Sequence, residues 1–305
     1  MCQKTMRNEL FDKFMSSNIH EILEFYDSFI DRHELTEWIK DVPKSHPKLE
    51  EVGNLDSEII VVIPTPSIEH KLSRNCQNAI FKGLKIVFSI DNSIYFNLSR
   101  SYNYGAKLLS NKKGIRWVIF SNVDMTLIDS PDKLMNELDD MTGEPSFCYA
   151  KGEGSHSYPI RVGEYTKLRN IAFNTTGKIR RIRATLERKY LIHINAEEEG
   201  NYFARKFVRR DKSMLNFGDF FIFSNDLLKR YNYEPFDERY LNGMEDIDLS
   251  MRLYNDLKQN SIRSIDYRIG SMKSAVRGRG IIRTFRNIPS LAYFNEKFED
   301  QNNVY

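Results

Sequence analysis

The chain of 305 residues is 41% hydrophobic, which is enough to bury one large core or two smaller ones. Its formal net charge of +3, with 29% charged residues, disfavours a dedicated nucleic-acid binder, for which a larger and more segregated positive charge is expected. Three widely separated cysteines, and apolar runs well short of the roughly 20 residues that span a bilayer, disfavour a disulfide framework, a zinc site and a transmembrane protein.

Residues 1–57 are predicted to form a helical extension at the N-terminus. Apolar residues recur there near the 3.6-residue period of a helix, as Leu10, Phe14 and Ile22 show. Two prolines within 41–47 then punctuate the end of the helical pattern.

From residue 59 onwards, strand-like and helix-like segments alternate. The β-branched run at 59–63 predicts a strand buried on both faces, as in a parallel sheet. The pattern then predicts a helix at 72–82, a strand at 84–90, a helix at 99–109, a strand from Trp117, a helix at 131–141, strands at 146–150 and 217–223, a short helix at 225–231 and a helix at 246–257. This alternation predicts an α/β fold built in layers.

Two segments are harder to interpret. The stretch 178–186 is consistent with a short helix or with a hairpin. Residues 259–305 are expected to form a C-terminal loop and tail, which ends in polar residues.

Polar residues follow the first three predicted strands, where ligands of open α/β sheets bind. Thr65 follows the first strand, Asp91 the second, and Asn122 and Asp124 the third. A carboxylate at such a position accepts the imide N–H of a pyrimidine, and an oxygen-rich loop holds Mg²⁺ or Mn²⁺ against a diphosphate. The alternative is that 91–93 is only a turn, because Asp, Asn and Ser favour turns in any protein.

A second acidic cluster begins the predicted helix at 246–257. Glu245 and Asp246 lie at its start, where carboxylates stabilise a helix whatever its function. Asp248 and Arg252 are four residues apart, so we expect them to form an ion pair on the surface of the helix.

Seven short motifs follow one another between about residues 58 and 258. They are Ile60-Val-Val-Ile-Pro-Thr65, Asp91-Asn-Ser93, Ser101-Tyr-Asn103-Tyr-Gly105, Phe120-Ser-Asn122-Val-Asp124, Phe217-Gly-Asp-Phe-Phe-Ile-Phe223, Phe236-Asp-Glu-Arg-Tyr240 and Glu245-Asp-Ile-Asp-Leu-Ser-Met-Arg252. Each motif alone is weak, but their order resembles that of family 2 glycosyltransferases with the GT-A fold.

This resemblance implies an inverting transfer of a sugar from a nucleotide diphosphate, with a UDP-sugar favoured as donor. Asp91 would contact the base, and Asn122 with Asp124 would correspond to the DxD-type motif that holds the divalent metal and the donor diphosphate. Asp246 would be the general base that deprotonates the acceptor hydroxyl, and Glu245 would support it or orient the acceptor.

The resemblance also implies that Pro64, Thr65 and Asn103 lie beside the donor. The sequence departs from the family in two ways. The first position of the DxD-type motif is the neutral Asn122, and all six histidines precede Glu245, whereas many family members complete the metal site with a later histidine.

Cationic residues near the C-terminus offer a substitute for that histidine. Arg277 and Arg279, with Lys273, are expected to neutralise the leaving diphosphate from a loop.

Residues 151–213 form a basic segment between the donor motifs and the second acidic cluster, and we interpret it as an insertion on the acceptor side. One hypothesis is that it recognises an acidic acceptor, or an anionic membrane that carries a lipid-linked acceptor. The alternative is an ordinary solvated face without an amphipathic pattern. The acceptor would be a glycan, a glycolipid or a protein. The location would be cytoplasmic, with contact at the inner face of the membrane as a further hypothesis.

Two other functions stay open at this point. A nucleotidyltransferase shares the sheet and the metal-bound diphosphate, but it typically has a glycine-rich phosphate loop, and the loop after residue 63 has no glycine. A non-catalytic relative would keep the fold and bind nucleic acid or a membrane through its basic segment.

Overall fold

The computed structural model describes residues 2–141, 143, 145–153, 159–161, 177–192, 214–216, 219–257, 261–272 and 281–299. The first half of the chain contains α1 (Cys2–Met15), α2 (Ile19–Asp27), α3 (Arg32–Asp41), β1 (Lys48–Gly53), β2 (Ile59–Thr65), α4 (Lys71–Asn75), the π-helix η1 (Cys76–Ile80), β3 (Lys85–Ile90), α5 (Leu98–Lys107), β4 (Trp117–Ser121), β5 (Met125–Leu127) and α6 (Pro131–Asp139).

The second half contains β6 (Phe147–Glu153), β7 (Pro159–Arg161), α8 (Gly177–Tyr190), β8 (Met214–Asn216), β9 (Phe220–Ser224), α10 (Asn225–Arg230), α11 (Glu245–Asp256), β10 (Ile262–Ser271), α12 (Ile281–Arg286) and α13 (Ile288–Glu299). Several helices begin with a side-chain cap. Asn97 caps α5, Ser130 caps α6 and Ser224 caps α10, each by accepting a hydrogen bond from a backbone N–H in the first turn.

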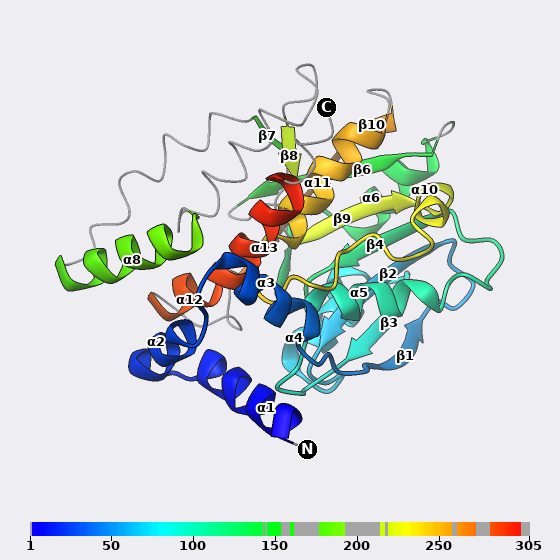
Figure 1. Ribbon diagram of the computed structural model, residues 1–305. Helices are drawn as coiled ribbons and strands as arrows, with labels where there is room; N and C mark the ends of the chain where they lie inside the picture. The colour runs from blue at the N-terminus through cyan, green and yellow to red at the C-terminus, as the bar shows by residue number, and fades with distance from the viewer. Residues whose placement is uncertain are drawn as a thin grey trace.

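The main sheet has eight strands in the order β1-β3-β2-β4-β9-β6-β10-β5 (Figure 1). Strands β3, β2 and β4 are parallel neighbours, and β10 is parallel to β6. Strand β9 runs antiparallel between β4 and β6, and β1 and β5 are antiparallel at the two edges. The predicted α/β fold is therefore confirmed as a mixed sheet, in which every residue of β2 is buried as the β-branched run indicated.

Helices cover both faces of this sheet. One face packs against η1 and α6, through residues such as Ile80 and Leu134. The other face packs against α5, α10 and α11, through residues such as Tyr102 and Leu249. Apolar side chains of these helices cover both faces of the sheet. Polar groups that could bind a ligand therefore lie at the ends of the strands.

Helix α5 lies unusually close to the sheet. A Cβ atom added at Gly105 would lie 2.4 Å from Cγ1 of Val62 in β2. Only glycine allows this approach, so Gly105 lets α5 pack directly on the middle of β2.

A third group of helices, here called the helical layer, consists of α1, α2, α3, α8, α12 and α13 and lies on the outer side of α11 (Figure 1). Helix α11 packs Ile247 and Met251 against this layer. Aromatic rings of the first three helices join in its centre, where Phe14, Phe25 and Trp38 lie with ring centroids 4.7–5.5 Å apart. Helix α11 is thus held between the sheet and the helical layer.

Several expectations from the sequence need correction. The expected loop and tail at 259–305 instead contains β10, an inner strand of the sheet, and the packed helices α12 and α13. Buried and exposed residues alternate along β10, as the buried Ile265, Tyr267 and Ile269 show. This alternation is typical of a strand, but the polar residues at the end of the chain favoured the prediction of a loop.

The N-terminal extension and the basic segment also differ from expectation. The helices predicted within 1–57 are present, but the same range also contributes β1, the antiparallel edge strand. The stretch 178–186 is helical and belongs to α8. In contrast to the expected lack of an amphipathic pattern, α8 buries Leu186 and Tyr190 while Arg181 and Arg188 are exposed.

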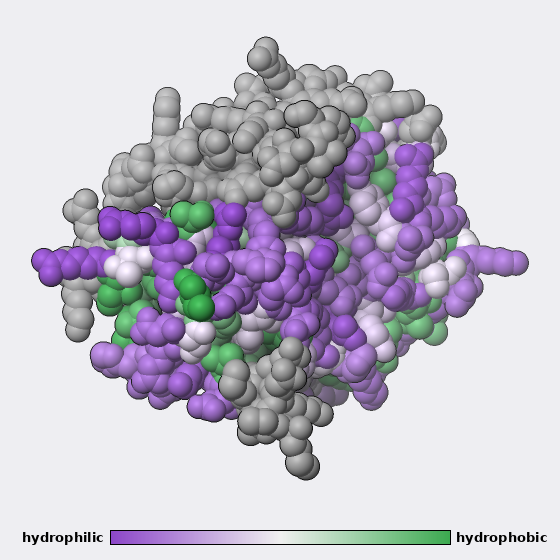
Figure 2. Space-filling model, viewed as in Figure 1, coloured by the Kyte–Doolittle hydropathy of each residue, from purple (hydrophilic) through white to green (hydrophobic). Residues whose placement is uncertain are grey.

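Within the described ranges, helices long and apolar enough to cross a bilayer are absent. Figure 2 shows a largely hydrophilic face, on which hydrophobic residues reach the surface mainly on the side of the N-terminal helices.

Candidate functional site

The candidate site lies at the edge where β2, β3 and β4 end. These strands are parallel neighbours, so their carboxyl ends meet at one edge of the sheet. Thr65 ends β2, and Asp91 and Asn122 directly follow β3 and β4. The backbone N–H of Asp91 donates to the carbonyl oxygen of Thr65 at 2.9 Å. The three loops therefore meet at one edge of the sheet, as we expected from the sequence.

Pro64 and Thr65 are buried at the end of β2. The Thr65 hydroxyl is 2.7 Å from the hydroxyl of Ser73, and it accepts a hydrogen bond from the N–H of Ser67 at 3.3 Å. The Thr65 side chain thus stabilises the loop that leads into α4. Pro64 and Thr65 would therefore contact a nucleotide donor through their backbone groups.

Asp91 is partly exposed, and both of its carboxylate oxygens accept hydrogen bonds from the protein. Oδ1 accepts from the backbone N–H of Ser93 at 2.9 Å, which forms the turn that the sequence offered as an alternative. Oδ2 accepts from the hydroxyl of Ser45, in the segment between α3 and β1. Asp91 is therefore both a turn residue and a fixed, accessible carboxylate.

Both polar atoms of the Asn122 side-chain amide form hydrogen bonds within the protein. Its Oδ1 accepts from the hydroxyl of Tyr102 in α5 at 2.8 Å, and its Nδ2 donates to Oδ1 of Asp219 at 2.7 Å. The backbone N–H of Asn122 also donates to the carbonyl oxygen of Asp219 at 2.9 Å. Asn122 thus connects β4, α5 and the residue before β9.

Asp219 is a site residue that the sequence reasoning missed. Its Oδ2 accepts from the hydroxyl of Ser271, the last residue of β10, at 3.1 Å. The sequence shows the apolar run of this strand but not its pairing, since Asp219 directly precedes β9, whose first residue, Phe220, pairs antiparallel with Ser121 at the carboxyl end of β4. The start of such a strand lies at the same edge as the ends of its parallel neighbours.

Asp124 is nearly buried, with 9% of its surface exposed. Its carbonyl oxygen accepts from the N–H of Met272 at 2.8 Å, which joins it to the end of β10. Beside it, the thiol of Cys76 in η1 donates to the carbonyl oxygen of Val123 at 3.3 Å. Burial, followed by the negative charge of Asp124, raises the pKa of Cys76 to about 12, so the thiol stays protonated and keeps this bond at neutral pH.

A divalent cation that bridges a protein to a diphosphate needs only one or two protein carboxylates, since phosphate oxygens and water complete its ligand shell. Asp219 fits this role because it is partly exposed and a carboxylate oxygen with one hydrogen bond keeps a lone pair. Asp124 offers the second carboxylate. Asn122 fits less well as a direct ligand, because its amide is engaged by Tyr102 and Asp219.

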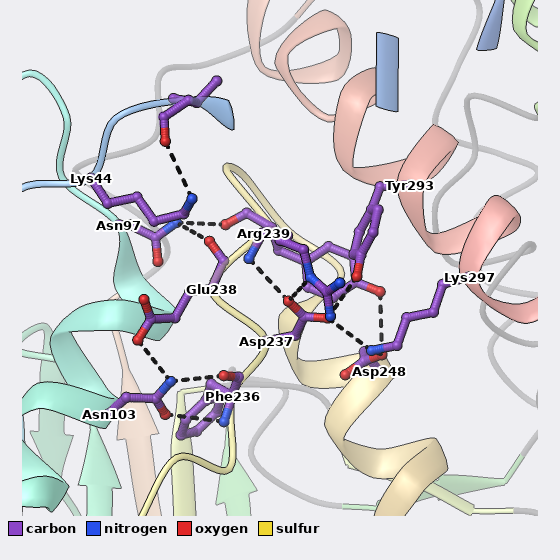
Figure 3. A network of polar contacts seen from close by, with 12 residues as sticks. Lys44, Asn97, Asn103, Phe236, Asp237, Glu238, Arg239, Asp248, Tyr293 and Lys297 are labelled. Atoms are coloured by element: carbon purple, nitrogen blue, oxygen red, sulfur yellow. Dashed lines mark hydrogen bonds and ion pairs between the residues drawn. The ribbon is translucent and has the colours of Figure 1, made fainter. Parts of the chain in front are cut away.

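Asn103 in α5 is bonded to the loop that leads into α11. Its Nδ2 donates to the carbonyl oxygen of Phe236 at 2.8 Å, and its Oδ1 accepts from the N–H of Phe236 at 3.1 Å (Figure 3). Asn97, at the start of α5, donates to the carbonyl oxygens of Glu238 and Tyr240 at 3.0 and 2.9 Å. The two asparagines therefore fix the loop that leads into α11.

The loop that leads into α11 lies beside the start of α5, because Asn97 caps α5 and donates to the carbonyl oxygen of Tyr240, five residues before Glu245. Gly243 and Met244 have φ angles of 83° and 74°, which turn the chain sharply into the helix. Glu245 is buried. Asp246 is partly exposed, and its Oδ1 accepts from the N–H of Ile247 at 2.9 Å.

Asp248 forms the expected ion pair, but the expected surface position is wrong. Nε of Arg252 donates to Oδ2 of Asp248 at 2.8 Å, as the spacing predicted. Asp248 is however 0% exposed, because α13 covers it, and Oδ1 accepts from Lys297 and from the hydroxyl of Tyr240. A charge at this depth requires these partners.

Lys297 also joins a second buried carboxylate, Asp237 (Figure 3). Arg239 donates two hydrogen bonds of 2.8 Å to Asp237, and the hydroxyl of Tyr293 donates one of 2.9 Å. Burial opposes ionisation, but the hydrogen bonds from Arg239 and Lys297 hold the pKa of Asp237 well below its usual range. These contacts fasten α13 to the loop before α11.

A groove of about 450 Å³ lies along this network. It is lined by Asn103, Glu234, Phe236, Asp237, Glu238, Arg239, Arg252 and Lys297. The charged groups of the groove are paired with one another or with neighbours such as Arg100 and Lys107. The charges of the groove are thus satisfied within the protein, whereas the residues singled out from the sequence lie at the strand edge.

Three expected cations, Lys273, Arg277 and Arg279, lie outside the described residues, as does most of the basic segment. Among the described residues, the geometry of His33, Glu37 and Glu296 resembles a metal site. Glu296 is already paired there with Lys40 at 3.2 Å, and this exposed group is remote in the fold from the strand edge.

No family model matches the chain, and a search of curated proteins found no match.

Proposed function

We propose that the protein is an inverting glycosyltransferase of the GT-A type, which transfers a sugar from a nucleotide diphosphate to an acceptor hydroxyl. The observation that supports this proposal is the edge of the sheet that Asp91 shares with the pair of Asn122 and Asp219. The loop that Asn97 binds at Tyr240 then leads to Asp246 at the start of α11. The mixed sheet, with antiparallel β9 between β4 and β6, is consistent with it.

In the proposed reaction, Asp246 accepts the proton of the acceptor hydroxyl while the hydroxyl oxygen attacks the anomeric carbon of the sugar. The bond from that carbon to the β-phosphate oxygen breaks, and its electron pair leaves with the nucleoside diphosphate. Attack from the face opposite the leaving group inverts the anomeric configuration. The bond from the N–H of Ile247 holds the Asp246 carboxylate in one orientation for this proton transfer.

The donor end of the site recognises the nucleotide and its diphosphate. Asp91 accepts a hydrogen bond from the base, and Asp124 and Asp219 would hold a divalent metal, Mn²⁺ or Mg²⁺. When bound, this metal neutralises the charge that develops on the leaving diphosphate. Asn122 keeps Asp219 oriented toward the end of β4.

One observation favours a second candidate, a non-catalytic relative of the same fold. The neutral Asn122 stands where the resembling family has an acid, and its amide is already engaged by Tyr102 and Asp219. Such a protein would bind neither donor nor metal at this edge.

Calorimetric titration with UDP, GDP, dTDP and CDP, with and without Mn²⁺ at one ionic strength, tests the proposal. We expect selective binding of one diphosphate that Mn²⁺ strengthens, and release of that diphosphate from its sugar conjugate on incubation. Absence of binding to all four, with or without metal, would favour the non-catalytic candidate.

A further inference from the structure

The turn at 242–244, which begins α11, has a strained backbone. Gly243 and Met244 both lie in the left-handed region, with φ angles of 83° and 74°. Glycine adopts this region freely, but a residue with a Cβ atom is strained there. Such strain persists only where the surrounding contacts fix the conformation, and it clusters at functional sites. The turn directly precedes Glu245 and Asp246.

The residue at the N-cap position of α11 does not cap the helix with its side chain. This residue is Met244, which makes no side-chain hydrogen bond to the first turn. Its side chain is instead buried, in the apolar cluster that includes Ile288 and Leu291 of α13. The geometry of the turn therefore depends on packing and on contacts from outside α11.

The junction between α12 and α13 supplies polar contacts to the same turn. The backbone N–H of Asn242 donates to the hydroxyl of Ser290 at 3.1 Å. The side-chain amide of Asn287 is bonded to that of Asn242, and with its nitrogen facing the turn it donates to the carbonyl oxygen of Asn242 at 3.0 Å. Ser290 is fully buried, so water does not compete for its hydrogen bond.

Helix α13 also contacts the chain on both sides of this turn. Lys297 donates to Asp237, in the loop before the turn, and to Asp248, in the first turn of α11. The contacts of Ser290 and Asn287 lie between these two anchors, at the turn itself. The start of α11 is thus held against α13 over its whole approach.

We infer that Ser290 and Asn287 are positioning residues for Asp246, which they hold in place through the turn at 242–244. The inference rests on the proposed function, in which Asp246 is the general base. Asp246 follows Met244 by two residues, so a change in the φ angle of Met244 redirects its carboxylate. A general base must lie within about 3 Å of the hydroxyl that it deprotonates, and a misplacement of about 1 Å reduces a rate by up to roughly 10²-fold. The C-terminal helices thereby acquire a role in the transfer of the sugar.

The test compares the full chain with Ser290→Ala, Asn287→Ala and the matched control Thr36→Val. Thr36 is a fully buried residue of α3 whose hydroxyl is bonded to Glu296, so its variant loses a hydrogen bond that α13 makes to α3 and not to the turn. Release of the diphosphate is measured with Mn²⁺ and UDP-glucose, UDP-galactose, UDP-N-acetylglucosamine, GDP-mannose, dTDP-glucose or CDP-glucose. We expect kcat to fall roughly 10- to 100-fold in Ser290→Ala and Asn287→Ala, with KM for the donor unchanged, because the donor-side residues are untouched. Amide hydrogen exchange at 242–248 should become faster in the same two variants, and Ser290→Thr, which keeps the accepting hydroxyl, should restore kcat.

The outcomes separate this inference from the proposed function. If the unmodified protein releases the diphosphate and the Ser290 and Asn287 variants do so with the same kcat, the positioning role is wrong while the glycosyltransferase proposal stands. An equal fall of kcat in Thr36→Val also overturns the inference, because the loss would then follow stability and not the turn. Absence of release by the unmodified protein from all of these donors overturns both. Thermal unfolding identifies a variant that fails to fold, and the other variant then decides.

Discussion

Tyr102 donates a hydrogen bond from its hydroxyl to the amide oxygen of Asn122 at 2.8 Å, and this bond fastens α5 to the end of β4. The ring of Tyr102 stacks on Phe236 with centroids 4.9 Å apart. A single residue thus links the donor-side loop to the loop that leads into α11. The amide of Asn122 is oriented by this bond, so that its nitrogen faces Asp219.

We expect Tyr102→Phe to keep the ring packing and to lose this one bond. The free energy of unfolding should fall by about 1 kcal/mol, the usual contribution of a hydrogen bond between neutral groups. Urea unfolding followed by tryptophan fluorescence measures the change. Tyr104→Phe, at an exposed tyrosine of the same helix, is the control and should leave stability unchanged.

Asp219 provides a sharper test of the donor site than Asn122. Asp219→Asn keeps an acceptor for the amide of Asn122 but removes the negative charge. We therefore expect Mn²⁺ to lose its strengthening effect on diphosphate binding, whereas Asn122→Ala should keep most of it. Calorimetry with and without Mn²⁺ gives both values. The reverse result, with Asn122→Ala the more damaging variant, would restore Asn122 as the metal ligand.

Much of the sheet could be predicted from the sequence, because a strand buried on both faces leaves a continuous apolar run, as in β2 and β4. The ends of β3 and β4 then located Asp91, Asn122 and Asp124. The partners of these residues could not be predicted in the same way. Asn122 and Asp219 are 97 residues apart, and Ser45 and Asp91 are 46 apart, so their contacts depend on strand pairing and on the path of the N-terminal segment.

The buried position of Asp248 was unpredictable for a related reason. The spacing to Arg252 is the same for a surface pair and for a buried one. What decides between them is Lys297, which lies 49 residues further on in α13, a helix that the sequence pattern did not reveal.

Removing Lys297 should therefore be costly. In Lys297→Met, Asp237 and Asp248 keep Arg239 and Arg252 but lose the cation that they share. We expect the free energy of unfolding to fall by about 3 kcal/mol, as for other buried pairs that lose one partner. Lys229→Met, at an exposed pair with Asp226, should leave the free energy of unfolding nearly unchanged, because water screens such a pair.

The same network predicts a dependence of stability on pH. The folded-state pKa of Asp237 lies below its unfolded value, so its ionisation contributes stability above about pH 4. That contribution is lost as the pH falls through the folded-state pKa. In Lys297→Met this pKa should rise, and acid unfolding should begin at a higher pH than in the unmodified protein. Circular dichroism during acid titration measures the two midpoints, and equal midpoints would contradict the assignment.

Gly105→Ala tests the close packing of α5 on β2. The new methyl group would lie 2.4 Å from Cγ1 of Val62, so the helix must shift away from the sheet. We expect a loss of about 2 kcal/mol in the free energy of unfolding, in the range of other overpacked cores. The double variant Gly105→Ala with Val62→Ala relieves the clash, so it should lose less than the sum of the two single variants.

Asp246→Asn tests the chemistry itself. The amide cannot accept a proton from the acceptor, while its carbonyl oxygen can still accept from the N–H of Ile247, so the start of α11 should be kept. We expect diphosphate binding to be unchanged and sugar transfer to fall about 10²- to 10⁴-fold, the usual contribution of a general base. Asp226→Asn, at an exposed aspartate in the first turn of α10, is the matched control. Because the acceptor is unidentified, release of the diphosphate from the sugar donor is the first readout, and near-normal release by Asp246→Asn would show that another group removes the proton.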